Sequence, residues 1–238
     1  MSLNRNAEPP PESLGKDSLT QIAYQKIKAA ILHCELPPGS RFSEQQIASL
    51  LQVSRTPVHQ AVVKLEQEGW LRFLPRKGVL ISAVTAEEMQ DIYEILTGLE
   101  ALGIMRLASR EPQAQDGIDE ALDQARLEGE RALARGDLEA WAEADDRLHT
   151  LFVDSSGNPH LSRLARNVRE QAHRARLLTL RLRPRPDASN ADHRIILDAI
   201  MARNPLAARE ALESHRTKGM ATLLPILRDL SVKARILG

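Results

Sequence analysis

Residues 41–78 read RFSEQQIASLLQVSRTPVHQAVVKLEQEGWLRFLPRKG, and this stretch decides how the rest of the chain is interpreted. Two short amphipathic helical patterns are separated by a tight turn and followed by a basic hairpin. The second helix begins near Ser54, and polar and cationic side chains such as Arg55 fill its first turn. A helix of this kind can place its N-terminal end in the major groove of DNA. The stretch therefore predicts a transcription regulator rather than an enzyme.

The segment before this stretch predicts one further helix. Apolar residues recur at helical spacing over residues 18–34, and the sequence from Glu35 to Gly39 ends the helix in a turn. Cys34 is the only cysteine of the 238 residues, so no internal disulfide can form. We expect it to be a small buried apolar residue within that helix.

A capping pattern marks the first helix of the pair. Ser43 is followed three residues later by Gln46, which is the spacing of a capping box. The helix that it begins is expected to run to about Leu51, with Ile47, Leu50 and Leu51 facing inward.

The second helix of the pair leads into a hairpin. Either Ser54 or Thr56 is expected to cap it. Strand-like runs follow at residues 70–74 and 79–82, joined by a basic tip. Three helices and a two-stranded wing make residues 18–83 a winged helix-turn-helix DNA-binding domain, whose reading helix is the second of the pair.

Charge is unevenly distributed along a chain whose formal net charge is zero. Residues 1–83 hold 10 Lys and Arg against 7 Asp and Glu, a balance of +3, and the remainder therefore carries −3. This fits a small DNA-binding module joined to a mildly acidic regulatory body.

The N-terminal residues 1–17 contain three consecutive prolines and scattered polar side chains, and we interpret them as a disordered tail. They lack the apolar core of a secretory signal, and no apolar run in the chain approaches the length of a membrane span. A lone cysteine suits a reducing compartment. The expected location is the cytoplasm.

Residues 84–238 contain no strand pattern and no glycine-rich loop, and we expect them to form one all-helical domain. Breaks at glycine and proline divide it into six helical stretches joined by short connections, which is typical of an antiparallel bundle. Pro225 is expected to end or kink the last helix. The expected helices are residues 85–109, 113–135, 137–155, 158–182, 190–203 and 205–224.

Several short motifs carry a family resemblance. In the first half they are Leu36-Pro37-Pro38-Gly39, Ser43-Glu44, Val53-Ser54-Arg55-Thr56-Pro57-Val58 and Leu65-Glu66-Gln67-Glu68-Gly69. In the second half they are Asp91-Ile92-Tyr93-Glu94, Leu99-Glu100, Gly157-Asn158-Pro159, Asp192-His193-Arg194 and Leu197-Asp198-Ala199-Ile200. The first half resembles the winged helix of the GntR family of bacterial transcription regulators. The second half resembles the metal-binding, FCD-type ligand domain of that family's FadR branch, and six helices would favour its VanR type.

Two positions depart from the resembled pattern. His59 stands where the family usually carries arginine, so a base contact there would be weaker or shifted in sequence preference. Leu96 stands where the family commonly carries an arginine that could pair with an acidic ligand, which leaves the ligand class open.

The resemblance assigns DNA contacts to the reading helix, its partner helix and the wing. Arg55 can make a bidentate contact to guanine O6 and N7, which discriminates by roughly 1–3 kcal/mol. Ser54 and Thr56 suit phosphate contacts or helix capping. The full expected set of DNA-binding residues is Arg41, Gln46, Ser54, Arg55, Thr56, His59, Gln60, Arg76, Lys77 and Gly78.

The resemblance also implies a divalent metal site. Asp145 and His149 stand at positions i and i+4 of one expected helix, a spacing that by itself indicates a surface pair more often than a metal site. The family's site adds two histidines, which here are His193 in the first turn of the fifth helix and His215 midway along the sixth. One carboxylate and three imidazoles suit Zn²⁺ or Ni²⁺. Asp146 is the alternative carboxylate if that helix is rotated.

A basic group on the fourth helix has two interpretations. His173, Arg174 and Arg176 lie on a helix that passes the metal in the resembled family, so they could contact the anionic group of a ligand. The alternative is an ordinary solvated basic face.

The favoured function is a ligand-responsive DNA-binding regulator. It is expected to bind a short inverted-repeat operator as a homodimer and to respond to a small metabolite, often a carboxylic acid, next to the metal. The connection over residues 83–85 is the expected hinge. A metal-dependent hydrolase is one alternative, but four protein ligands leave no open position in a tetrahedral site. A ligand-independent nucleic-acid-binding protein is the other.

Overall fold

The computed structural model describes residues 16–111 and 117–237 and divides the chain into two compact units, Met1–Ala83 and Val84–Gly238. Most of the expected tail at residues 1–17 and the start of the helix expected at residue 113 lie outside the described residues. The fold is mainly helical, as the sequence predicted, with a small sheet in the first unit.

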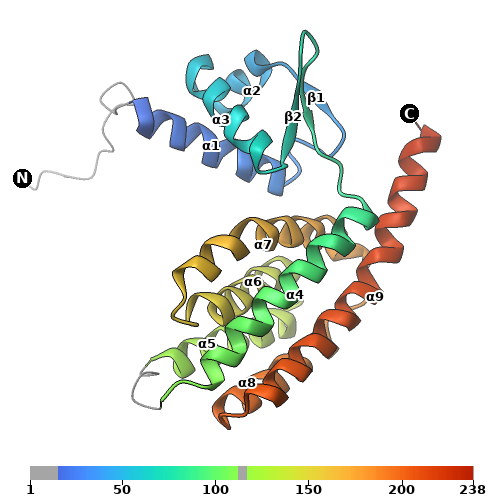
Figure 1. The fold of residues 1–238 in the computed structure, drawn as a ribbon. Helices are drawn as coiled ribbons and strands as arrows, with labels where there is room; N and C mark the ends of the chain where they lie inside the picture. Colours follow the sequence, from blue (N-terminus) through green and yellow to red (C-terminus); the bar gives the residue numbers. More distant parts are fainter. Residues whose placement is uncertain (1–15, 112–116, 238) are drawn as a thin grey trace, which may run out of the picture. The chain divides into compact units, whose positions relative to one another are not determined.

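The first unit is a winged helix-turn-helix (Figure 1). Its buried core joins side chains of all three helices to the hairpin, including Ile27, Val58, Leu65 and Trp70. Such burial stabilises the unit by roughly 1.5–3 kcal/mol for each large apolar side chain. The elements are α1 (Lys16–Leu32), β1 (Arg41–Phe42), α2 (Glu44–Leu51), α3 (Arg55–Gln67), β2 (Leu71–Leu74) and β3 (Gly78–Ile81).

Ser43 begins α2 with the predicted capping box. The Ser43 hydroxyl accepts from the Gln46 N–H at 3.1 Å, and the Gln46 side chain accepts from the Ser43 N–H at 2.7 Å. Ser54 occupies the N-cap position of α3, although its side chain makes no capping hydrogen bond there.

The sheet has three strands rather than the two that were predicted. Its order is β1-β3-β2, and both pairings are antiparallel. The two-residue strand β1 pairs through Arg41 with Leu80 and through Phe42 with Val79. A strand of this length is too short to show an alternating apolar pattern, so it could not be predicted from the residues alone.

Two expectations about side chains of the first unit were wrong. Leu50 is 52% exposed, because the core contacts of α2 are made by Ile47 and Ala48. Cys34 lies after the end of α1 in a turn, with a left-handed φ of 59° and intermediate burial. The helix stops two residues earlier than predicted, which places the thiol outside it.

The connection between the units is anchored on both sides. The Ser82 N–H donates to the Trp70 carbonyl of the first unit at 3.1 Å. Val84 is buried among side chains of the second unit, and the Thr85 hydroxyl caps the next helix by accepting from the Glu88 N–H. Only Ala83 lies between these anchors.

The second unit contains six α-helices in its described part, which matches the predicted number. Helices α4 and α9 run antiparallel and pack side by side (Figure 1). The elements are α4 (Ala86–Ala108), α5 (Ile118–Ala134), α6 (Leu138–Asp154), α7 (Pro159–Thr179), the 3-10 turn η3 (Leu180–Leu182), α8 (Asp187–Met201) and α9 (Pro205–Leu237).

A close backbone approach joins α4 to α6. A Cβ atom on Gly103 would lie 2.6 Å from the Phe152 carbonyl oxygen, so only glycine fits at this position. The approach brings α4 against the helix that carries Asp145 and His149, and thus helps to place the candidate site.

Pro225 was expected to end or kink the last helix, and it does not end it, because α9 continues to Leu237. Leu223 and Leu227, on either side of Pro225, are buried against α4 and hold the helix in place. Pro225 itself is exposed, so solvent can bond the carbonyl group that loses its N–H partner. Among the described residues, none of the helices combines the length and apolar character needed to cross a membrane.

Candidate metal centre and candidate DNA-reading surface

The first turn of α3 presents the reading residues to solvent. The Arg55 side chain is 71% exposed and that of His59 is 57% exposed, whereas Pro57 and Val58 between them are buried in the core. Thr56 and Gln60 are also exposed. The helix therefore has one face that fixes it to the unit and another that is available to a partner.

Glu44 lies next to this surface and was not identified as a site residue from the sequence. Its carboxylate contacts His59 Nδ1 at 2.7 Å and lies 3.9 Å from Arg55 Nε. Glu44 belongs to α2, the first helix of the pair, so its carboxylate connects the two helices through contacts with side chains of α3. The motif Ser43-Glu44 was visible in the sequence, but the partners of Glu44 depend on how the two helices cross.

The other expected DNA contacts divide into exposed and structural residues. Arg41, Arg76 and Lys77 are exposed on the sheet and its tip. Gln46 is exposed, but its side-chain oxygen is engaged in the capping box. Gly78 has a structural role, because its φ is +83° and an added Cβ would lie 2.4 Å from the Phe42 carbonyl oxygen.

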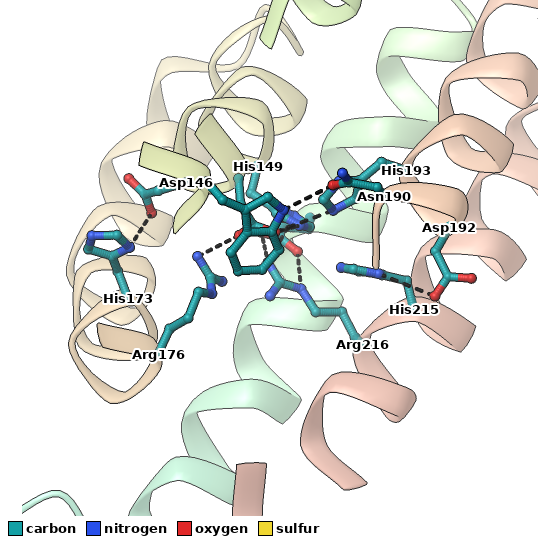
Figure 2. A network of polar contacts seen from close by, with 12 residues as sticks. Asp146, His149, His173, Arg176, Asn190, Asp192, His193, His215 and Arg216 are labelled. Atoms are coloured by element: carbon teal, nitrogen blue, oxygen red, sulfur yellow. Dashed lines mark hydrogen bonds and ion pairs between the residues drawn. The ribbon is translucent and has the colours of Figure 1, made fainter. Parts of the chain in front are cut away.

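In the second unit, four predicted residues from three helices meet at one point. Asp145 and His149 come from α6, His193 from α8 and His215 from α9. One ligand atom from each lies within 4.8 Å of the others, and all four residues are buried. Figure 2 shows the three histidines close to one another. His193 Nε2 is 3.4 Å from Asp145 Oδ1. Because α8 begins at Asp187, His193 lies one turn further into its helix than the sequence analysis placed it.

The cluster is electrically suited to a divalent cation. Burial would raise the pKa of Asp145, but the adjacent Arg176 guanidinium and the histidines hold that pKa well below its ordinary value. Burial and Arg216 keep the pKa of His149 well below its usual value. Burial and His215 lower the pKa of His193 to about 3. The carboxylate is therefore ionised and these two imidazoles are neutral near pH 7, which are the forms that bind metal.

Unpartnered atoms support the fit. Among the described residues, His149 Nε2, His193 Nε2 and Asp145 Oδ2 are buried without a hydrogen-bond partner. Asp145 Oδ2 lies 2.5 Å from Arg176 Nη1, although the two groups are not aligned for a hydrogen bond. Buried polar atoms are rarely left unpaired, so several at one place indicate a missing ligand. Three imidazoles and a carboxylate fit Zn²⁺ or Ni²⁺.

Two carboxylates orient the imidazoles from outside the cluster. Asp192 Oδ2 lies 3.6 Å from His215 Nδ1, and the pKa of Asp192 is lowered to about 2, first by His215 and then by Lys218. Glu100 Oε1 lies 3.3 Å from His149 Nδ1. Outer carboxylates of this kind fix the ring orientation of metal-binding histidines.

Arg216 competes with Glu100 for the same histidine nitrogen. Its guanidinium is paired with the fully buried Glu100 and also lies 2.9 Å from His149 Nδ1 (Figure 2). That nitrogen cannot accept from Arg216 and donate to Glu100 at once. Binding of metal through Nε2 requires the proton on Nδ1, and Glu100 is then its acceptor. Neither Glu100 nor Arg216 was predicted as a site residue from the sequence.

The remaining sequence-predicted residues lie around the cluster. Arg174 and Arg176 are almost completely buried, so the interpretation as a solvated basic face was wrong for them. His173 lies 3.7 Å from Asp146, which places the alternative carboxylate outside the cluster. Leu96 is fully buried among apolar side chains of α4, α7 and α9 and offers no charge to a ligand.

Two cavities adjoin the cluster. The inner cavity, of about 40 Å³, is lined by Asp145, His215, Arg176 and Arg216 among others. The outer cavity, of about 180 Å³, has apolar walls that include Leu180. Five residues line both cavities: Trp141, Arg183, Ser189, His215 and Gly219. A small molecule in the outer cavity would therefore border the inner one.

Comparison with known families finds two matches along the chain. Residues 19–81 match the family described as bacterial regulatory proteins, gntR family. Residues 91–218 match the family described as FCD domain.

Two curated relatives are similar over much of their length. An HTH-type transcriptional regulator of Agrobacterium vitis, from the TAR-I ttuE-ttuC' intergenic region, is 36% identical over 157 residues, covering 64% of this chain and 91% of the relative. The HTH-type transcriptional regulator YdhC of Bacillus subtilis is 30% identical over 208 residues, covering 87% of this chain and 91% of the relative.

A solved structure has the same fold. The Escherichia coli protein McbR/YncC superimposes with a TM-score of 0.71 at 20% identity, covering 90% of this chain and 98% of that one. At this identity the likeness describes the fold alone.

Proposed function

The chain belongs to the gntR family of bacterial regulatory proteins and carries an FCD domain, so it is a transcription regulator, and we propose that it binds an inverted-repeat operator as a homodimer in response to a small metabolite. In this proposal residues 18–83 bind DNA, and residues 84–238 sense the metabolite and dimerise. The division of the chain after Ala83 supports this assignment. Neither matched family is an enzyme family by its description, so the comparisons offer no support for the hydrolase alternative.

The exposed surface of α3 supports the proposed DNA contacts. Arg55 can reach guanine from a helix end whose buried face is anchored in the core. Arg76 and Lys77 at the wing tip supply charge for phosphate or minor-groove contacts. The complete proposed set remains Arg41, Gln46, Ser54, Arg55, Thr56, His59, Gln60, Arg76, Lys77 and Gly78.

Exposed apolar side chains support a dimer through the helical unit. Ile95 and Leu102 of α4 lie seven positions apart, on one face, and are 54% and 48% exposed. Leu164 on the adjoining helix α7 is also exposed. Apolar side chains gathered in this way are typical of an interaction surface, and a two-fold dimer would give the operator its inverted repeat.

The observation that carries the sensing proposal is the buried meeting of one carboxylate and three imidazoles. Asp145, His149, His193 and His215 would hold the divalent ion, with Zn²⁺ or Ni²⁺ favoured by the donor set. The ion would add positive charge beside the cavities, which suits an anionic metabolite. His173, Arg174 and Arg176 are the proposed neighbours of that metabolite, with Arg176 nearest to the cluster because it contacts Asp145.

The metabolite must bind one state of the protein better than another in order to regulate it. We propose that the two states differ in how the DNA-binding domains are presented to the operator. The connection over residues 83–85 is the proposed hinge, and within it Ala83 is the residue without an anchor to either unit among the contacts described.

The test begins with selection of DNA from a random duplex library by the purified full-length protein. We expect enrichment of a short inverted repeat that binds two chains, measured by fluorescence anisotropy and by the mass of the complex. The protein with charge-introducing changes at the dimer face, Ile95→Glu with Leu102→Glu, should bind a half-site but lose tight binding to the full repeat. Enrichment of no sequence, or of a site bound by one chain, would contradict the proposal.

A further inference from the structure

The cations around the two cavities are almost all paired. Five cationic side chains of lysine or arginine line the inner or outer cavity. Four of them have a carboxylate partner: Arg176 with Asp145, Arg185 with Asp187, Arg216 with Glu100 and Lys218 with Asp192. Arg183 is the exception, because no carboxylate of the described residues lies within ion-pair distance of it.

Arg183 also differs from the other four in its position. It follows η3 in the connection between α7 and α8, and it lines both cavities. Its side chain is half-buried, and burial together with the nearby charge of Arg176 lowers its pKa. A cation that is partly removed from water and has no counter-ion costs free energy in the folded protein. An anion bound beside Arg183 would offset this cost.

The surroundings of Arg183 define what an anion there must look like. The outer cavity is bounded by apolar surfaces of Trp141, Leu180, Pro184 and Pro186. The inner cavity, at about 40 Å³, has room for only a few atoms, given that one water needs roughly 10–15 Å³. A fitting molecule therefore combines one small charged group with a short apolar body.

We propose that Arg183 is the anion-binding residue of the effector site and that it pairs with the carboxylate of a small organic acid whose apolar part fills the outer cavity. The planar guanidinium suits a carboxylate because two parallel hydrogen bonds can form. The acid group would lie at the boundary of the two cavities, where Ser189 and His215 are also present. This inference rests on the proposed sensing function. It places the cation that binds the effector's carboxylate in the connection between α7 and α8.

The experiment compares Arg183→Gln with a matched control, Arg185→Gln. Arg185 lines the same outer cavity but is already paired with Asp187 at 3.3 Å. Full-length, metal-loaded protein is titrated calorimetrically with acetate, butyrate, benzoate and inorganic phosphate. We expect the wild type to bind at least one carboxylate, Arg183→Gln to lose at least about tenfold in affinity and Arg185→Gln to lose less than about threefold. Metal content should be unchanged in both variants.

A second readout does not depend on choosing the right acid. Without added anion, Arg183→Gln should melt about 2 °C or more above the wild type, because an uncompensated charge has been removed. A lower melting temperature would show that Arg183 has a structural partner, and equal carboxylate affinity in the wild type and Arg183→Gln would overturn its role. Binding of phosphate alone would overturn the carboxylate class, as would binding of none of the four anions.

Operator binding separates this inference from the proposed function. If Arg183→Gln binds operator as the wild type does but no longer responds to the acid, both stand. If no operator is found while Arg183-dependent acid binding persists, the sensing role fails and the anion site remains.

Discussion

Arginine is used in opposite ways in the two units. Arg55 is exposed on α3 and has one distant carboxylate neighbour, whereas Arg176 and Arg216 are buried and each contacts a carboxylate closely. An exposed guanidinium keeps its hydration until a partner arrives, so its contribution appears only on binding. A buried one must be compensated within the fold, and removal of its partner is costly. The first unit therefore keeps an available charge at its surface, whereas in the second unit Arg176 and Arg216 are already paired within the fold.

The largest effect is expected from removal of a buried imidazole. His193→Ala should lower the affinity for Zn²⁺ more than about 100-fold, because losing a direct ligand exceeds the 10–100-fold typical of outer partners. Metal content and a competition titration with a chelating dye measure this. His160→Ala, at an exposed position of α7, is the control. Unchanged affinity in His193→Ala would mean that the buried cluster does not hold the metal.

A substitution on the exposed reading surface should change DNA affinity without changing metal affinity. Arg55→Ala should weaken binding to the selected operator by roughly 5- to 150-fold, equivalent to about 1–3 kcal/mol, and leave Zn²⁺ affinity unchanged. Fluorescence anisotropy at one fixed salt concentration measures it. Arg72→Ala, an exposed cation on β2, should have a much smaller effect. If the two variants lose affinity equally, Arg55 provides charge but no base recognition.

An intermediate effect is expected where a buried carboxylate orients a ligand. Glu100→Gln should reduce Zn²⁺ affinity about tenfold, because a neutral amide is a weaker acceptor for His149 Nδ1 and leaves Arg216 to compete for that nitrogen. Glu213→Gln, which alters an exposed pair with Arg209, is the control. Zn²⁺ affinity as high as that of the wild type, in a variant that still folds, would exclude Glu100 as an orienting residue.

The smallest effect concerns the acid beside the reading surface. Glu44→Gln should strengthen binding to unselected DNA about threefold, because a negative charge near the phosphates is removed and Arg55 loses a competing partner. The comparison protein is Glu35→Gln, which changes the same charge at an exposed turn. Equal changes in both would show that only the net charge of the unit matters.

Local chemistry predicted much of the fold. Capping residues such as Ser43 and breaks at glycine and proline located helix ends to within a few residues. The errors occur where tertiary contacts decide. Strand β1 exists because β3 offers it a partner, and α9 passes Pro225 because buried leucines lie on both sides of it.

The candidate metal centre was predictable only through the family resemblance. Four residues spread from Asp145 to His215 have no spacing that would identify a site by itself. The surrounding residues were missed for the same reason, since Glu100 and Arg216 are 116 positions apart in sequence. Arg183 could not be recognised because its distinguishing property is that no carboxylate of the described part of the chain pairs with it, which requires knowledge of its neighbours in space.

The anchoring of Ser82 and Val84 has a consequence for how a signal could leave the helical unit. With one unanchored residue between them, rotation is concentrated in the φ and ψ angles of Ala83. Because the connection is so short, a small reorientation at the start of α4 would be transmitted almost fully to the DNA-binding unit. A longer flexible linker would not transmit it. Insertion of Gly-Ser after Ala83 should then leave both units folded and each able to bind its own ligand, but binding at one unit should no longer affect binding at the other.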